Sequence, residues 1–388
     1  MKLKQLPPDF FVEEISSISI SQDKKAHSIF IMEKKELDTF GAIRLISIKT
    51  NVPLFEIGYA GLKDKHAVTR QFISIPSKYN VQSLVLDKLG LNFVGYNNKK
   101  IKIGDLKGNK FSIVVRDIRP NKIDNIHEKI KNVSLFGVPN YFDSQRFGSV
   151  FNNEFIGKHL VKKNYETAVK IFLTRYLKSE NKNVKNEKRN ILKNWSKLEN
   201  ISVHNKVFAQ IIKEYLKTNS WLDAYKKIPA NLREIHINAY QSYLWNECIK
   251  EIIRVCVNGK KIYSVEYAVG SLYFYKDLNN EELGKIPSVF PTLSDTVKLS
   301  EFDNKIVSKV ISNEKITIQD LDIKILTGNF FKTRKRQVMI IPENFNISPT
   351  MDDELNTING KPQRKIILSF FLLKGSYATI ITKKIFNQ

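Results

Sequence analysis

The sequence predicts an α+β fold in which one mixed sheet, built from both ends of the chain, carries a largely helical insertion. Strand-like stretches, several with alternating apolar and polar residues, occur among helices in about the first 150 of the 388 residues, and strand character returns after about residue 330. The residues between show the three-to-four spacing of amphipathic helices. At this length the chain accommodates two or three domains, and one interrupted sheet is the simplest arrangement for all three stretches.

The N-terminal part mixes strand-like and helix-like stretches. Asp38 or Thr39 supplies an N-cap for the first helix, and Pro53 follows its end. The predicted strands are 27–33, 71–75 and 111–118, and the predicted helices are 38–49, 81–89 and 121–131.

The middle of the chain is mainly helical, and strands return near the C-terminus. Residues 178–188 are polar and are interpreted as a loop. A stripe of Tyr240, Leu244 and Cys248 on the longest helix is typical of a buried core. The predicted helices are 164–177, 190–198, 205–216 and 229–254, and the later elements are strands at 336–341 and 365–373 and a short closing element at 376–385.

The charge balance points to a polyanionic partner. Lys and Arg number 63 against 39 Asp and Glu, a formal net charge of +24. Nucleic acid is the commonest such partner, because each neutralised phosphate releases a counterion; a Lys-rich coding bias is the alternative. Basic residues cluster in 99–110, 178–193 and 332–336. Each cluster alone is typical of a solvated face, but several on one surface would form a track for phosphates.

The cysteines and the apolar runs bear on the compartment. Cys248 and Cys256 provide no disulfide framework and no CxxC pair, which favours the reducing cytoplasm. A strongly apolar run, Ile366–Leu373, is far shorter than the roughly 20 residues that span a bilayer. No apolar stretch follows Met1 as in a secretion signal, so we expect no membrane partner.

The most unusual segment surrounds Asp64. Lys63 and Lys65 flank this carboxylate, His66 follows, and Gly61 permits a tight turn before it. Nearby cations favour an ionised carboxylate, which can act as a nucleophile, a base or a metal ligand. An aspartate in a basic surface turn is the structural alternative.

The sequence gives little support for metal binding, nucleotide binding or acyl transfer. Asp64 and His66 lack a third ligand at metal-binding spacing. The chain contains no phosphate-binding GxxxxGK[ST] or GxGxxG and no GxSxG for acyl transfer. We therefore expect no metal and no nucleotide cofactor.

Three further segments combine aromatic with polar groups. Residues 138–148 interleave aromatics with amides and an arginine, groups that stack on bases and read their edges. Residues 373–379 end an apolar strand, and residues 7–14 resemble an edge strand. Each is also compatible with packing alone.

Together these segments resemble the TruD family of tRNA pseudouridine synthases. The family's N-terminal pattern, a basic residue followed by P-E-D-F-x-V-x-E, corresponds to Lys4–Glu13. Its G-x-K-D-x-x-A-x-T-x-Q is matched in full by Gly61–Gln71, and its N-Y-F-G-x-Q-R-F-G by Asn140–Gly148 with one change. The helix around Ser242 and the G-S-[FY]-A-T at Gly375–Thr379 also match, so the resemblance runs from residue 3 to about residue 380.

The resemblance implies a tRNA partner and an isomerase that converts uridine 13, in the D arm, to pseudouridine without redox step, metal or cofactor. It implies that Asp64 is the catalytic nucleophile and that Lys4 is the cation beside it. Phe10, Asn140 and Tyr377 match substrate-contacting positions of the family. Phe142 matches an aromatic position whose ring can stack on a base extruded from the RNA helix.

The resemblance also implies a domain division. The catalytic pseudouridine synthase domain would comprise residues 1–154 and 339–388, and residues 155–338 would form the inserted domain named after the family. Two residues depart from the family pattern: Pro8 replaces Glu, and Asp143 replaces Gly. Either could alter which RNA is accepted, and no obligate protein partner is expected.

Two rival functions fit parts of the sequence. A non-catalytic RNA-binding protein or tRNA chaperone would share the charge and the aromatics, but binding does not require a carboxylate in a phosphate-rich site. A phosphoryl-transfer enzyme using Asp64 would need further carboxylates for Mg²⁺.

Overall fold

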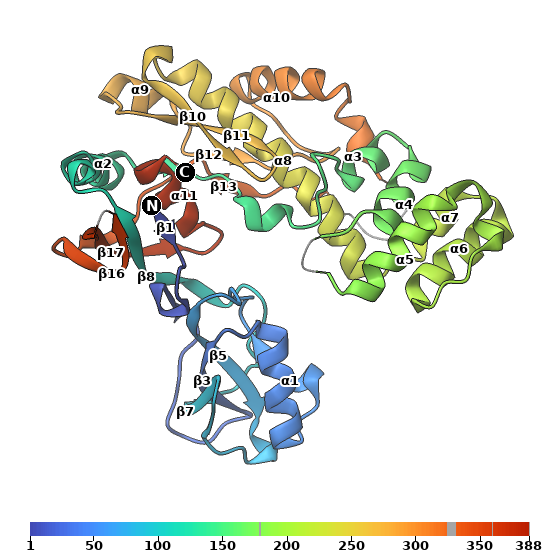
Figure 1. Ribbon diagram of the computed structural model, residues 1–388, viewed down its shortest axis with the longest axis horizontal. Coiled ribbons are helices and arrows are strands. Elements are labelled where there is room, and N and C mark those ends of the chain that lie inside the picture. The colour runs from blue at the N-terminus through green and yellow to red at the C-terminus, as the bar shows by residue number, and fades with distance from the viewer. Residues whose placement is uncertain (178–179, 324–330, 359, 388) are drawn as a thin grey trace. The chain divides into compact units, whose positions relative to one another are not determined.

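A computed structural model of the protein describes residues 1–177, 180–323, 331–358 and 360–387 (Figure 1). They divide into two compact units. The first unit comprises residues 1–137 and 340–387, and the second comprises residues 138–339. The architecture confirms the predicted α+β class with a mixed sheet.

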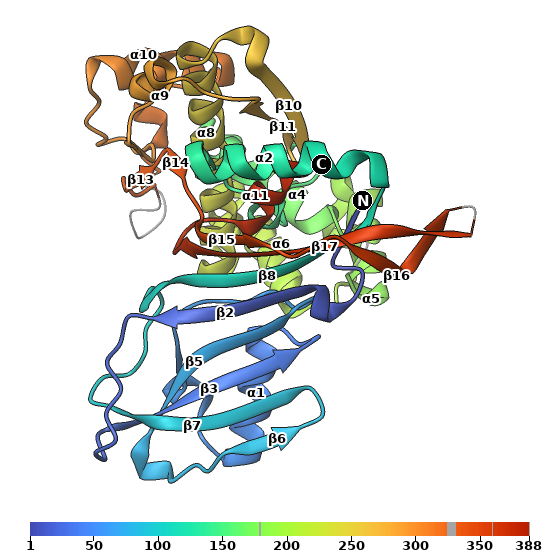
Figure 2. The same ribbon diagram turned by 90° about the vertical axis from the view of Figure 1, so that its left-hand side faces the viewer.

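The first unit is built on an 11-stranded sheet whose main path runs β15-β17-β8-β2-β5-β3-β7-β6 (Figure 2). Strands β2 and β5 pair in parallel, whereas the other pairs in this path are antiparallel. The strands are β1 (Lys2–Leu3), β2 (Phe10–Ser16), β3 (His27–Lys35), β4 (Gly58–Tyr59), β5 (Val68–Pro76), β6 (Leu84–Leu86), β7 (Leu89–Asn97), β8 (Leu106–Ile118), β15 (Glu343–Ile347), β16 (Met351–Ile358) and β17 (Lys361–Leu373).

Both chain ends contribute to the middle of this sheet. β8 lies between β2 and β17, and Phe111 of β8 is opposite Phe370 of β17. Ile113, Leu368 and Phe370 are buried, because successive side chains of a strand point to opposite faces of the sheet and these three point to the core. The prediction of a sheet that draws strands from both ends of the chain is confirmed.

Three helices cover the sheet. α1 (Thr39–Thr50) packs Ala42, Ile43 and Ile46 against the buried side chains of β3, β5 and β7. Its N-cap is Asp38, whose carboxylate accepts the Gly41 N–H at 2.8 Å. α2 (Ile123–Phe136) and α11 (Ala378–Phe386) lie side by side near β8 and β17 (Figure 2).

The second unit is organised around α8 (Ala230–Cys256), which buries residues along most of its length, including the predicted core stripe of Tyr240, Leu244 and Cys248. Two two-stranded antiparallel sheets accompany it: the hairpin of β10 (Ile262–Tyr267) and β11 (Gly270–Tyr275), and the pair of β12 (Val289–Pro291) and β13 (Lys335–Gln337), which are far apart in sequence. β9 (Val138–Pro139) begins the unit, and β14 (Met339–Ile340) spans its end. The other helices are α3 (Ile156–Val161), α4 (Tyr165–Thr174), α5 (Lys182–Lys193), α6 (Lys206–Thr218), α7 (Trp221–Lys226), α9 (Asn280–Lys285) and α10 (Glu301–Glu314).

The predicted helix at 81–89 is wrong. These residues contain β6, a two-residue turn and the start of β7, and Leu84 pairs with Leu91. Leu84 and Leu86 are partly buried against the core, whereas Val85 between them is 84% exposed. Burial therefore alternates with the two-residue period of a strand rather than the three-to-four period of a helix. Asp87 and Lys88 form the turn between the two strands.

The predicted loop at 178–188 is also wrong over most of its length. α5 starts at Lys182, after its N-cap Asn181, and residues 178–179 lie outside the described residues. Lys188 is buried, donates to the Arg175 carbonyl at 2.7 Å and pairs with Glu180. One lysine of this basic segment therefore holds the fold rather than facing solvent.

Candidate active site

The loop between β4 and β5 carries Asp64. Thr39 Oγ1 accepts the Lys63 N–H at 2.9 Å, and the Gln71 amide donates to the Gly61 carbonyl at 3.1 Å. Thr39 and Gln71 are buried, and the Thr39 hydroxyl donates to the Gln71 side-chain oxygen at 3.3 Å. Two buried polar side chains therefore fix the backbone that leads into Asp64.

The Asp64 carboxylate has two partners. One oxygen accepts the His66 N–H at 3.0 Å, and the other pairs with the Lys4 ammonium. The Asp64 and Lys4 side chains are 24% and 26% exposed. Burial raises the pKa of Asp64, but the hydrogen bond and charge of Lys4 and the His66 N–H outweigh it, so the pKa lies below its ordinary value. The carboxylate is ionised at neutral pH and still reachable from solvent.

The N-terminal segment brings Lys4 and Phe10 to Asp64. Lys4 has a left-handed φ of 54°, and its ammonium lies 4.1 Å from the centroid of the Phe10 ring. Phe10 is buried and meets Phe111 edge-on at 6.2 Å. Lys4 thus contacts two other predicted site residues, Phe10 of its own segment and Asp64 of a distant loop.

A buried arginine anchors this segment. Arg116 of β8 pairs with Asp9 at 2.9 Å, with Asp353 at 3.0 Å and with Glu354 at 3.1 Å. Asp9 also accepts the Leu6 N–H at 2.8 Å. Since Asp9 directly precedes Phe10, these contacts fix the turn that positions both Phe10 and Lys4.

Sequence reasoning missed two side chains beneath the loop. Glu14 of β2 is buried, pairs with Lys63 at 2.5 Å and accepts the Phe72 N–H at 3.2 Å. Lys63 is thereby neutralised by Glu14, while Asp64 takes Lys4 as its partner. The second missed residue, Lys34, is buried in β3 and donates to the Asp64 carbonyl at 2.9 Å.

Asn140 and Phe142 belong to the second unit. The Asn140 side chain donates to the Gln337 carbonyl at 3.0 Å, and its oxygen accepts from Arg336 at 2.8 Å. The Phe142 backbone is clamped by Asn246, which accepts its N–H at 2.9 Å and donates to its carbonyl at 2.8 Å. Sequence reasoning missed Arg336 and Asn246.

The Phe142 ring lies among cations. The guanidinium of Arg336 is 4.2 Å from its centroid and that of Arg146 is 5.2 Å away. The ring is 9% exposed and also meets Trp245 edge-on at 6.4 Å. Two arginines beside an aromatic ring would suit a phosphate and a base of one nucleotide.

The two departures from the family pattern have local structural explanations. Pro8 is exposed within a short 3-10 helix, Pro7–Asp9, where the fixed φ of proline is compatible with the first turn. Asp143 is buried and accepts the Ser144 N–H at 2.7 Å, so it caps the short helix Ser144–Phe147. The Asp143 carboxylate therefore has a structural partner, the first N–H of this short helix.

Tyr377 belongs to the first unit and is the residue before α11. It is partly buried, and its carbonyl accepts the Ile380 N–H at 3.1 Å. Gly375, two residues earlier, has a φ of 85°, a conformation that favours glycine and allows the turn from β17 into the helix.

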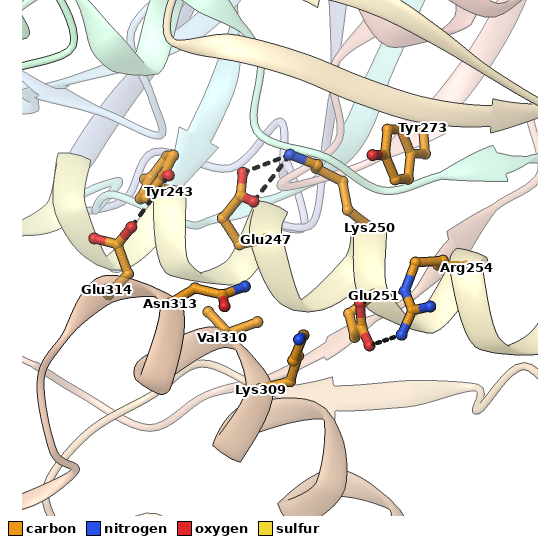
Figure 3. Close-up of a pocket in the computed structure, with 10 residues that line it drawn as sticks. All are labelled: Tyr243, Glu247, Lys250, Glu251, Arg254, Tyr273, Lys309, Val310, Asn313 and Glu314. Carbon is orange, nitrogen blue, oxygen red and sulfur yellow. Dashed lines mark hydrogen bonds and ion pairs between the residues drawn. The ribbon is translucent and has the colours of Figure 1, made fainter.

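A cavity of about 190 Å³ in the second unit lies between α8 and α10 (Figure 3). Lys250 pairs with Glu247 and Arg254 with Glu251 along α8, and Tyr243 donates to Glu314 of α10. Burial is the main cause that raises the pKa of Glu247. The sequence did not predict this cavity, because its walls come from α8, α10 and Tyr273 of β11, which are separate in the chain.

Within the described ranges, no group of three or more His, Cys, Asp or Glu side chains has the geometry to hold a metal ion. In the described part of the chain, no helix is long and apolar enough to cross a membrane.

Comparison with protein families matches residues 1–385 to the family described as tRNA pseudouridine synthase D (TruD). Among similar curated proteins, "Probable tRNA pseudouridine synthase D 1" of Methanococcus maripaludis is 39% identical, and the alignment covers all of both chains. "Probable tRNA pseudouridine synthase D 2" of Methanocaldococcus jannaschii is 40% identical over all of this chain and 92% of its own.

A solved structure shares the fold. The crystal structure of the putative tRNA pseudouridine synthase D from Methanosarcina mazei superposes with a TM-score of 0.73 at 24% identity, covering all of this chain and 93% of the other.

Proposed function

Because the chain belongs to the tRNA pseudouridine synthase D (TruD) family, we propose that it is an isomerase that converts uridine 13 of tRNA to pseudouridine. The bond from ribose C1′ to N1 of the base breaks, the base turns, and a bond from C1′ to C5 forms. C5 loses its hydrogen and N1 gains one, so substrate and product have the same composition. No oxidant, reductant or nucleotide cofactor enters the balance.

The observation that carries the proposal is the ion pair between Lys4 of the N-terminal segment and Asp64 of the matched loop. We assign Asp64 as the nucleophile, since its carboxylate is ionised, accessible and held in one orientation. Lys4 maintains that ionisation, and the His66 N–H fixes the second oxygen. A surface aspartate without function would not need three buried side chains, Thr39, Gln71 and Lys34, to hold its loop.

Substrate contacts are assigned by matched position. We assign Phe10, Asn140, Phe142 and Tyr377 as substrate-binding residues. The cations around Phe142, Arg336 and Arg146, support this assignment, because they could pair with the flanking phosphates. We propose a catalytic domain of residues 1–154 and 339–388 and an inserted domain of residues 155–338; Gln388 lies outside the described residues.

We place the reaction in the cytoplasm, where tRNA is present and where the two free, buried cysteines would stay reduced. The decisive experiment is pseudouridine mapping on cellular RNA with and without this protein. Loss of one tRNA modification, restored by the wild-type chain, would support the proposal. An unchanged map together with tight tRNA binding would favour the chaperone instead.

Lys4→Met is expected to move the acid limb of the rate–pH profile to higher pH. The pKa of Asp64 is lowered in the fold, so the reactive carboxylate persists until the pH falls through that lowered value. Without Lys4, burial remains and raises the pKa of Asp64. Single-turnover rates between pH 4 and 8 measure the shift. Lys65→Met, an exposed neighbour, is the control, and an identical profile for both variants would reject Lys4 as the partner.

Activity is expected to survive EDTA. With tRNA folded beforehand and held in monovalent salt, the rate should stay within about twofold of the untreated rate, because the proposed chemistry uses a carboxylate and an ammonium. Rates before and after chelation, with a metal add-back, test this. A loss restored only by Zn²⁺ or Mg²⁺, with tRNA structure unchanged, would reject the mechanism.

A further inference from the structure

Lys34 is a buried lysine that the reaction described above does not use. It lies near the end of β3, and only 1% of it is exposed. Lysine is almost never fully buried unless its ammonium finds partners, because desolvation of the charge is costly. Packing alone therefore does not explain why a lysine occupies position 34.

The ammonium of Lys34 faces backbone oxygens on two sides. It donates to the Leu37 carbonyl at 2.7 Å, to the Asp64 carbonyl at 2.9 Å and, more weakly, towards the Lys63 carbonyl at 3.5 Å. An ammonium has three N–H donors and no acceptor, which matches three carbonyls. Lys34 thus ties the turn after β3 to the residue proposed as the nucleophile.

We propose that Lys34 is a positioning residue for Asp64, an inference that rests on the function proposed above. Its ammonium holds the backbone of the loop so that the Asp64 carboxylate stays between the Lys4 ammonium and the His66 N–H. A shift of about 1 Å in a reacting group can cost roughly 100-fold in rate. Lys34 acts through Asp64 and does not touch the substrate.

The charges that face Lys34 come from neighbouring elements. Asp64 and Asp38 favour its charged form, and Lys63 opposes it. Lys63 is itself paired with Glu14, and Asp64 with Lys4. Burial is the largest cause and lowers the pKa of Lys34 to about 8.

This environment makes the loop sensitive to alkaline pH. Above pH 8 the amine keeps two N–H donors for three carbonyls, so the loop loses one of its bonds. Stability changes in the opposite direction: between about pH 8 and the ordinary pKa of 10.5 the unfolded chain binds the proton and the folded chain does not. The contribution of Lys34 to folding stability therefore rises with pH in this window, so loss of the Lys34 proton does not by itself unfold the chain.

The test compares Lys34→Met, Lys34→Arg and the exposed control Lys35→Met. We would measure single-turnover rates at saturating enzyme from pH 6 to 10, tRNA affinity, thermal unfolding and amide hydrogen exchange of residues 61–67. Lys34→Met should lower the rate at pH 7 by roughly 10- to 100-fold, speed exchange in the loop, leave tRNA affinity within about twofold and remove the alkaline limb near pH 8. Lys34→Arg should recover part of the rate and keep it at higher pH, because arginine stays protonated.

A wild-type rate and unchanged loop exchange in Lys34→Met would overturn the proposal. If Lys34→Met does not fold, Lys34→Arg decides: an alkaline limb that stays near pH 8 would overturn it, and one that is displaced upward would support it. Failure of the proposed function looks different. In that case the wild-type chain itself would form no pseudouridine, whereas failure of this inference alone leaves an active wild type.

Discussion

Asp64→Asn is expected to lower pseudouridine formation by more than about 10⁴-fold, the order of loss seen when an enzyme's nucleophile is removed. The amide keeps the size of the side chain and can still accept the His66 N–H, so the loop should remain folded. tRNA affinity should change less than about threefold, because phosphate contacts supply most of the binding energy. Single-turnover assays and a binding titration on one tRNA preparation measure both quantities.

The control is Asp87→Asn, in the exposed turn between β6 and β7, which should behave as wild type. If Asp64→Asn retained turnover within tenfold of wild type, Asp64 would not be the nucleophile. If it lost tRNA binding in proportion to rate, the carboxylate would serve binding and the non-catalytic function would gain support.

Arg116→Met is expected to destabilise the protein by about 3–5 kcal/mol, the usual cost of removing one partner from a buried ion pair. Asp9 and Asp353 are both buried and would lose their cation. Activity should fall as well, even where the protein stays folded, since Asp9 holds the segment that carries Lys4 and Phe10. Urea denaturation gives the stability change, and rates at low temperature give the second effect.

Arg364→Met is a matched control in the same sheet. Arg364 pairs with Asp352, and both side chains are largely exposed, 40% and 63%. Exposed pairs contribute only about 0–1 kcal/mol. Equal destabilisation by the two variants would show that burial of the Arg116 cluster does not matter, contrary to our interpretation.

Local patterns predicted most of the fold. Asp38, one of the two predicted N-caps, caps the first helix, and the alternation along β8 and the apolar run of β17 identified two strands that pair in the sheet. One error, at 81–89, occurred where two periods overlap in a short segment: its apolar residues fit a short helix as well as a hairpin. The pairing of Leu84 with Leu91 distinguishes the hairpin from the helix, and this pairing is visible only in the folded chain.

The candidate site was predictable where it is continuous in sequence. Asp64 and Lys4 were identified because each lies in a matched segment, and the structure pairs them. Glu14 and Lys34 were missed because their partners, Lys63 and the Asp64 carbonyl, are reached across neighbouring strands of the sheet. The sequence around a charged residue in a strand does not show which loop its side chain will contact in the folded protein.

The position of β17 beside β8 has a consequence for synthesis on the ribosome. β17 begins at Lys361, after the whole of the second unit has been translated. At roughly 5–20 residues per second, synthesis from the end of β8 at Ile118 to the start of β17 takes about 12–50 s. During this time one edge of β8, 13 residues long, has no neighbour, and an open strand edge invites pairing with other chains. Its lysines Lys107 and Lys110, both exposed in the finished fold, provide like charge that disfavours such pairing between nascent copies.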